Sequence, residues 1–239
     1  MRQLTTIFLL PALLLAAGCA GIRDAVLEGG IDLGSGQLNE ATTAAGLREA
    51  LTVGTERTVA RVTAQDGYIG NPDIRIPLPA QWTRPARMLR DVGLGSYVDE
   101  IDMTMNRAAE RAAREAYPVF ADAVAAMTIR DAFAILEGTD TEATDYFRRQ
   151  TEKELRARYA PVVTAQMEQL GVTRAYAKAR DLYEGLPMIV SVEAVDLEAY
   201  VVDGALDGLF TVLAQEERRI RQDPVARTTA LLKRVFGGP

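Results

Sequence analysis

The sequence predicts an all-α protein, a multi-helix bundle around a central helix near the carboxyl end, with one short extended proline-rich segment. Aromatic residues make up only 6% of the chain, and alanine and leucine supply most of its apolar side chains, which favours closely spaced helices over a sheet. The central helix is expected at residues 196–221, because apolar residues there occupy two helical stripes. One stripe contains Leu197, Tyr200, Val201, Ala205, Leu209, Val212 and Leu213, and the other contains Val202, Leu206 and Phe210.

Two glycines and two aspartates interrupt the apolar coat of this helix. Gly204 and Gly208 remove side-chain bulk, so we expect another backbone to approach the helix closely there. Asp203 and Asp207 form a narrow acidic edge. The pattern therefore predicts a helix that its neighbours surround on most sides.

The first residues have the pattern of a secretory signal peptide at 1–18, with a positive start, an apolar run too short to span a membrane permanently, and small residues before Cys19. Residues 15–19, Leu-Ala-Ala-Gly-Cys, resemble the bacterial lipobox, which implies that Cys19 becomes the new N-terminus and carries acyl chains. Ala20 resembles the outer-membrane sorting class of Gram-negative bacteria. We therefore expect an outer-membrane lipoprotein facing the periplasm. Ordinary cleavage, leaving a soluble periplasmic protein with a free thiol, is the alternative.

Residues 19–38 contain this cysteine and several glycines, which predicts a flexible tether, and residues 39–239 predict a single helical domain. Its first helix is expected at 39–63, stopped by Asp66 and Gly67. Residues 71–79 contain three prolines and the alternation Ile74, Ile76, Leu78, so they predict an extended segment laid over the bundle, with a short strand as the variant. Arg75 would point outward or into a salt bridge.

The remaining helices are expected at regular intervals. Pro85 suits the first turn of a short helix that runs to Val92. Ser96 and Asp99 form a capping-box pattern for the next helix, and Thr128 to Asp131 caps a short helix that Gly138 ends.

A long helix should then start at Asp140 or Thr141, kink at Pro161, bury Leu170 and stop at Gly171. One more helix is expected at 173–183, a buried loop or brief strand at 185–195, and a final helix from Asp223 through Phe236.

Residue counts exclude several kinds of chemistry. The chain has no histidine and one cysteine, so Ser-His-Asp and Cys-His catalysis, ordinary zinc sites and the Glu-x-x-His di-iron motif are absent. No glycine-rich phosphate loop appears, and we expect neither a cofactor nor a bound metal. The formal net charge of -6 argues against nucleic acid as a partner, because phosphate backbones repel an acidic protein.

Six stretches of the sequence resemble a known bacterial family, the domain of unknown function 4197. They are Gly46–Leu51, Asn71–Pro79, Met105–Glu110, Ala143–Phe147, Ala205–Phe210 and Pro224–Thr229. The family commonly has lysine where this chain has Gly204. The resemblance implies an exported, mostly helical domain, often a lipoprotein, and it implies no activity.

A polar pocket is expected beside the central helix. Its candidate residues are Arg75, Asp102, Asn106, Arg107, Glu110, Tyr146 and Asp207. Asp102, Asn106 and Glu110 recur every four residues and could face Asp203 and Asp207 around a hard cation. The favoured interpretation is that Arg75, Arg107, Arg111 or Arg148 neutralises these carboxylates in structural ion pairs.

No residue is assigned a catalytic role. We expect a non-enzymatic binding or scaffold domain of the cell envelope, attached to the membrane through its acyl chains, that binds an envelope protein or a small ligand. A hydrolase that uses paired carboxylates is one alternative. A carrier of small hydrophobic ligands, lined by Met103, Met105, Met127 and Met167, is another.

Overall fold

The computed structural model describes residues 40–186, 195–223 and 225. The expected signal peptide, Cys19 and the tether lie outside the described residues. So do most of the expected loop or strand at 185–195 and the expected final helix after Asp223.

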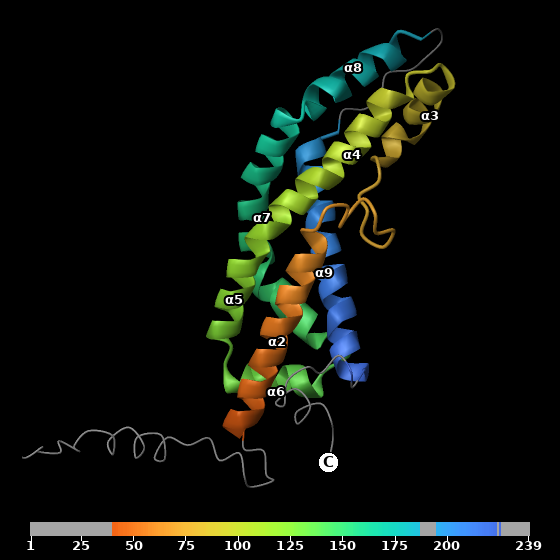
Figure 1. The fold of residues 1–239 in the computed structure, drawn as a ribbon. Helices are drawn as coiled ribbons and strands as arrows, with labels where there is room; N and C mark the ends of the chain where they lie inside the picture. The colour runs from red at the N-terminus through yellow and green to blue at the C-terminus, as the bar shows by residue number, and fades with distance from the viewer. Residues whose placement is uncertain (1–39, 187–194, 224, 226–239) are drawn as a thin grey trace, which may run out of the picture. The chain divides into compact units, whose positions relative to one another are not determined.

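The described residues form only helices, turns and irregular segments, with no strand among them, which confirms the all-α prediction (Figure 1). The α-helices are α2 (Glu40–Val62), α3 (Thr83–Asp91), α4 (Gly95–Ala112), α5 (Ala116–Ala126), α6 (Ile129–Glu137), α7 (Glu142–Gln169), α8 (Val172–Glu184) and α9 (Leu197–Gln222). Short 3-10 turns lie at Ala80–Trp82 and Ala113–Glu115. The expected short strand within 71–79 is therefore absent, and that segment is a turn followed by extended backbone.

Helix α9 is the central helix. It packs against α7, α2 and α4, and Figure 1 shows it in blue alongside α2 in orange. Both predicted apolar stripes are buried, apart from the partly exposed Tyr200, while Asp203 and Asp207 are exposed. Its N-terminus is capped by Asp196, whose carboxylate accepts a hydrogen bond from the Ala199 N–H.

Of the two predicted N-terminal caps, one forms, and it is a full capping box. Thr128 and Asp131 cap α6 reciprocally, and the hydrogen bonds from the Thr128 hydroxyl and N–H lower the pKa of Asp131. The box predicted at Ser96 is wrong, because α4 already begins at Gly95 without a side-chain cap. Asp99 forms an ion pair with Arg90 of α3 instead.

The long helix α7 differs from expectation at its two ends. It starts at Glu142 after Thr141, whose side chain makes no capping bond. Pro161 lies inside the helix, which continues to Gln169. Leu170 was expected to point inward but is 44% exposed, because the chain leaves the helix there and turns at Gly171 with a φ of 74°.

Candidate functional site

The proline-rich residues 68–79, here called the strap, pack against α9 at its two glycines. A Cβ atom on Gly204 would lie 3.0 Å from Cγ1 of Ile76, and one on Gly208 would lie 2.6 Å from Cε1 of Tyr68. Ile74 and Ile76 are buried, as their alternation with Arg75 predicted. A close approach to the glycines therefore occurs, but side chains of the strap make it, where the sequence predicted another backbone.

Asn106 of α4 holds the middle of the strap. Its Nδ2 donates to the Ile76 carbonyl at 2.9 Å, and its Oδ1 accepts from the Ile76 N–H at 2.9 Å. Nδ2 also donates to the carbonyl of Asp102, one turn earlier in α4. The Asn106 side chain is fully buried, so it supplies the two hydrogen bonds that a neighbouring strand would otherwise give to this extended backbone.

Glu110 of α4 holds the start of the strap. Its carboxylate accepts from the Tyr68 N–H at 3.2 Å and from Nη1 of Arg107 at 2.7 Å. The Tyr68 hydroxyl donates to the Ala205 carbonyl of α9 at 2.6 Å. Burial first, and the negative charge of Glu110 second, raise the pKa of Tyr68 far above its ordinary value. Arg107 also pairs with Asp66 at 2.7 Å, and its hydrogen bond to Glu110 is the main cause of its raised pKa.

The other candidate carboxylates are paired with arginines. Asp102 pairs with Arg75 of the strap, and Asp207 pairs with Arg148 of α7 at 3.2 Å. Asp203, further along the acidic edge, pairs with Arg156. These are ion pairs of the kind the sequence favoured. Among the described residues, no group of three or more acidic or sulfur side chains is placed to hold a metal ion.

A groove of about 400 Å³ lies between the strap and α9, and we call it the α9 groove. Gly204 and Gly208 line it together with Asp73, Arg75, Tyr200, Asp203, Asp207 and Thr211. The Tyr200 hydroxyl donates to the Pro77 carbonyl at 3.1 Å. The groove therefore presents carboxylates, hydroxyls and the Arg75 guanidinium beside the part of α9 where side chains of the strap pack onto the two glycines.

The seven predicted pocket residues fall into three places. Arg75 and Asp207 line the α9 groove, while Asp102 and Asn106 of α4 hold the strap beside it. Arg107 and Glu110 line a separate groove between α4 and α7, which is described below. Tyr146 joins neither group. It packs edge-on against Phe147, with ring centroids 5.9 Å apart, and burial raises its pKa.

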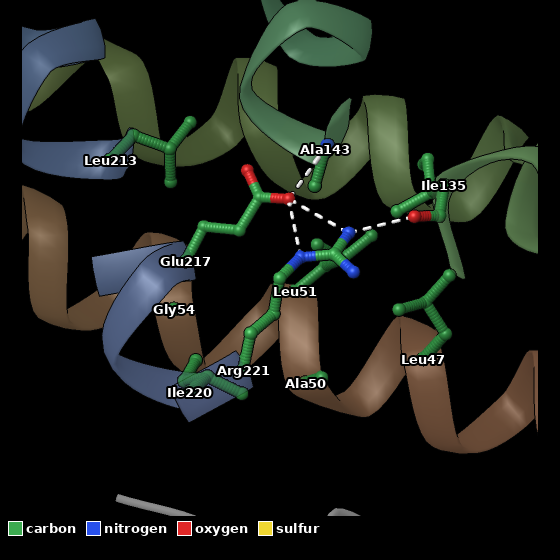
Figure 2. A pocket seen from close by; sticks show the side chains of 10 residues that line it. All are labelled: Leu47, Ala50, Leu51, Gly54, Ile135, Ala143, Leu213, Glu217, Ile220 and Arg221. Atoms are coloured by element: carbon green, nitrogen blue, oxygen red, sulfur yellow. Dashed lines mark hydrogen bonds and ion pairs between the residues drawn. The ribbon is translucent and has the colours of Figure 1, made fainter. Parts of the chain in front are cut away.

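Sequence reasoning missed a second polar site, at the junction of α6 and α7 (Figure 2). The Glu217 carboxylate accepts from the Ala143 N–H at 2.9 Å and from the N–H and hydroxyl of Thr144, each at 2.8 Å. Arg221 donates its Nε to Glu217 at 3.0 Å and its Nη2 to the Ile135 carbonyl at 2.7 Å. Glu217 thus caps α7 from another helix, and Arg221 binds the last turn of α6.

This site borders a small apolar cavity of about 30 Å³ between α2 and α9. Figure 2 shows Glu217 and Arg221 from α9, with Leu47, Leu51 and Ile135 around the same space. The sequence signal that could have revealed this site was the position of Glu217. It lies four residues after Leu213, on a stripe that is otherwise apolar, and a carboxylate there needs a buried partner.

The sequence model of one family matches residues 37–237, nearly all of the chain after the expected tether, under the description "Protein of unknown function (DUF4197)". The chain belongs to this family. In this DUF4197 protein, the Asn71–Pro79 and Ala205–Phe210 stretches that suggested the resemblance meet at the α9 groove. No curated protein and no solved structure is detectably similar to the DUF4197 chain. None of its described helices combines the length and the apolarity that crossing a membrane requires.

Proposed function

We propose that the chain is a binding or scaffold domain of the bacterial envelope, attached to the outer membrane through acyl chains on Cys19. Its binding surface is the α9 groove, and its partner is an envelope protein or a small ligand. The groove supplies hydrogen-bond acceptors from Asp73, Asp203 and Asp207, so it suits a partner with cationic or hydrogen-bond donor groups.

The observation that supports this proposal best is that the carboxylates of Asp102 and Glu110 are engaged in contacts that hold the strap. Glu110 is bonded to Arg107 and to the Tyr68 N–H, and Asp102 is bonded to Arg75. A hydrolase that used either carboxylate would first have to break contacts that hold the strap. Asp207 is 72% exposed in its side chain, so it is available to a partner in addition to Arg148.

Single amide substitutions test the alternative of a carboxylate-based hydrolase. Glu110→Gln should lower the melting temperature most, because it weakens two contacts of a buried group. Asp207→Asn should lower it least, since the exposed pair contributes little. Loss of a measured hydrolytic turnover at unchanged melting temperature in any of the variants Asp102→Asn, Glu110→Gln or Asp207→Asn would favour the hydrolase.

Site-specific cross-linking in the envelope tests the groove itself. A photoreactive residue at Thr211, which is exposed and lines the α9 groove, should give a defined product, and Asp207→Arg should remove that product. The matched control is Ala125, which is exposed on α5. The same products from both positions, or none from Thr211, would argue against a binding role for the groove.

The proposed anchor has a separate test. Cys19→Ser should abolish incorporation of labelled fatty acid and move the protein from the outer-membrane fraction to the soluble periplasmic fraction. An unchanged membrane fraction would contradict attachment through this cysteine.

A further inference from the structure

A second groove, of about 520 Å³, lies on α4 and α7, and we call it the arginine groove. Arg107, Arg111 and Arg114 line one wall, at spacings of four and three residues that place them on one side of α4 and the turn after it. Gln166 and Gln169 of α7 line the other wall, and Gln65 lies near the end of α2. The volume is within the range of small-molecule sites, roughly 300–1,000 Å³.

The positive charge in this groove is only partly neutralised. Arg107 is shared between Glu110 and Asp66. Within the described part of the chain, Arg111 and Arg114 form no ion pair with a carboxylate, and both are exposed. Three arginines and one glutamate line the groove, and Asp66 pairs with Arg107, which leaves a local charge of about +1 in a chain whose net charge is -6. The site therefore attracts an anion that the rest of the surface repels.

We propose that the arginine groove binds a small phosphorylated molecule with a hydroxyl-rich body, with Arg111 and Arg114 on the phosphate. Guanidinium groups match phosphate oxygens with paired hydrogen bonds. Gln166 donates to Gln169 at 3.3 Å, which uses one donor and one acceptor and leaves further capacity on both amides for hydroxyl groups. Leu170, 44% exposed at the same groove, offers an apolar contact to the C–H groups of a sugar ring.

Calorimetric titration of the purified full chain tests this assignment with a hexose 6-phosphate, the unphosphorylated hexose, inorganic phosphate and a hexose carboxylate. The hexose phosphate should bind at least about tenfold more tightly than the other three, because only it engages both the arginines and the amides. Its affinity should rise between about pH 5 and about pH 7.5, as the phosphate loses its second proton near pH ~6. Equal binding of the carboxylate, or no binding of the hexose phosphate, overturns the proposal.

A matched pair of double variants separates the groove from general charge. Arg111→Gln with Arg114→Gln should weaken hexose phosphate binding by at least about tenfold. The control, Arg84→Gln with Arg87→Gln, removes two exposed arginines at the same spacing on α3 and should leave the affinity unchanged. Equal losses in both double variants overturn the site. Melting temperatures within error of the parent protein confirm that both variants are folded.

The same chemistry occurs on soluble sugar phosphates and on lipid headgroups, and a further titration distinguishes these sources. Short-chain phosphatidylglycerol, used below its micelle concentration, should bind more tightly than the hexose phosphate if the natural ligand is a lipid headgroup. The reverse order identifies a soluble phosphorylated ligand. Whichever probe binds more tightly, its binding should require Arg111 and Arg114. Binding of either probe that is unchanged in the double variant contradicts the proposal.

Discussion

The two halves of α9 each hold irregular backbone in place, but they do so with different chemistry. In the first half, Tyr200–Gly208, two glycines leave room for side chains of the strap, and the Ala205 carbonyl accepts a hydrogen bond from the neutral Tyr68 hydroxyl. The second half holds the α6–α7 junction with an ionised pair, Glu217 and Arg221. One helix therefore combines a steric and neutral site with a charged one.

The two regions should therefore be sensitive to different substitutions. The strap depends on shape, on the neutral hydrogen bonds of Asn106 and Tyr68, and on the carboxylates of Glu110 and Asp102. Steric changes and lost hydrogen-bond partners should therefore loosen it. The junction depends on a carboxylate that is 8% exposed, so removal of Arg221 takes the cation away from a buried charge, and removal of Glu217 takes the carboxylate away from a partly buried guanidinium. Substitutions in each region test this contrast.

Glu217→Ala should cause the largest loss of stability. It removes the acceptor of three hydrogen bonds at the start of α7 and the carboxylate that pairs with Arg221. Breaking a buried pair in this way costs roughly 3–5 kcal/mol in the free energy of unfolding. The matched control is Glu154→Ala, which breaks an exposed pair of the same i,i+4 spacing with Arg158 and should cost less than about 0.5 kcal/mol. Urea unfolding measures both, and similar losses in the two variants would contradict a special role for Glu217.

Asn106→Leu should destabilise the strap by roughly 2–4 kcal/mol. Leucine has nearly the same size, but it leaves the N–H and C=O groups of Ile76 buried without partners. Hydrogen exchange should show faster exchange of the Ile76 amide, with the amides of Ala143 and Thr144 unchanged. Equal acceleration at the α6–α7 junction would show that the two regions open together and are not independent.

The first half of α9 was readable from the sequence because its signals are local. Gly204 and Gly208 stand four residues apart on an apolar helix, and the alternation of Ile74 and Ile76 marks the strap that covers them. The row Asp102, Asn106, Glu110 indicated that polar groups lie there. The sequence could not show that Asn106 binds backbone atoms, because spacing along one helix does not identify what lies opposite.

The contacts of the second half of α9 could not be predicted from the sequence in the same way. Glu217 accepts hydrogen bonds from Thr144 and Ala143, which precede it in the chain by 73 and 74 positions. No local pattern near Ala143 indicates an acceptor from another helix. Tyr146 lies apart from the other candidate residues for a related reason. It shares α7 with Arg148, but its ring faces Phe147 while Arg148 reaches Phe210 and Asp207 on α9. Helix periodicity predicts which face is buried, and the partner on that face depends on how the helices pack.

Gly208→Ala should destabilise the protein by about 1–2 kcal/mol. The added methyl group would meet Tyr68 at 2.6 Å and Ile74 at 3.2 Å. The destabilisation from such overpacking is larger than the stabilisation from the higher helix propensity of alanine. The control is Gly54→Ala in α2, where the added methyl group would meet only Ile220 at an ordinary 3.5 Å. That variant should be stabilised by about 0.5–1 kcal/mol. Thermal unfolding distinguishes the two signs, and stabilisation by Gly208→Ala would mean that the strap is not held tightly against α9.

Tyr68→Phe should change how stability depends on alkaline pH. Burial raises the pKa of Tyr68 in the folded protein, whereas the unfolded chain ionises this group near pH ~10. The stability that the protonated hydroxyl supports is therefore present below about pH 10 and is lost as pH rises from there towards the folded pKa. Between about pH 9 and about pH 11, the advantage of the parent protein over Tyr68→Phe should shrink by about 1 kcal/mol. Tyr117→Phe is the control, because Tyr117 is 47% exposed and its substitution should leave the pH dependence unchanged. A constant difference between the parent and Tyr68→Phe would show that the hydroxyl remains able to ionise in the folded state, and hence that water reaches the strap where it meets Ala205.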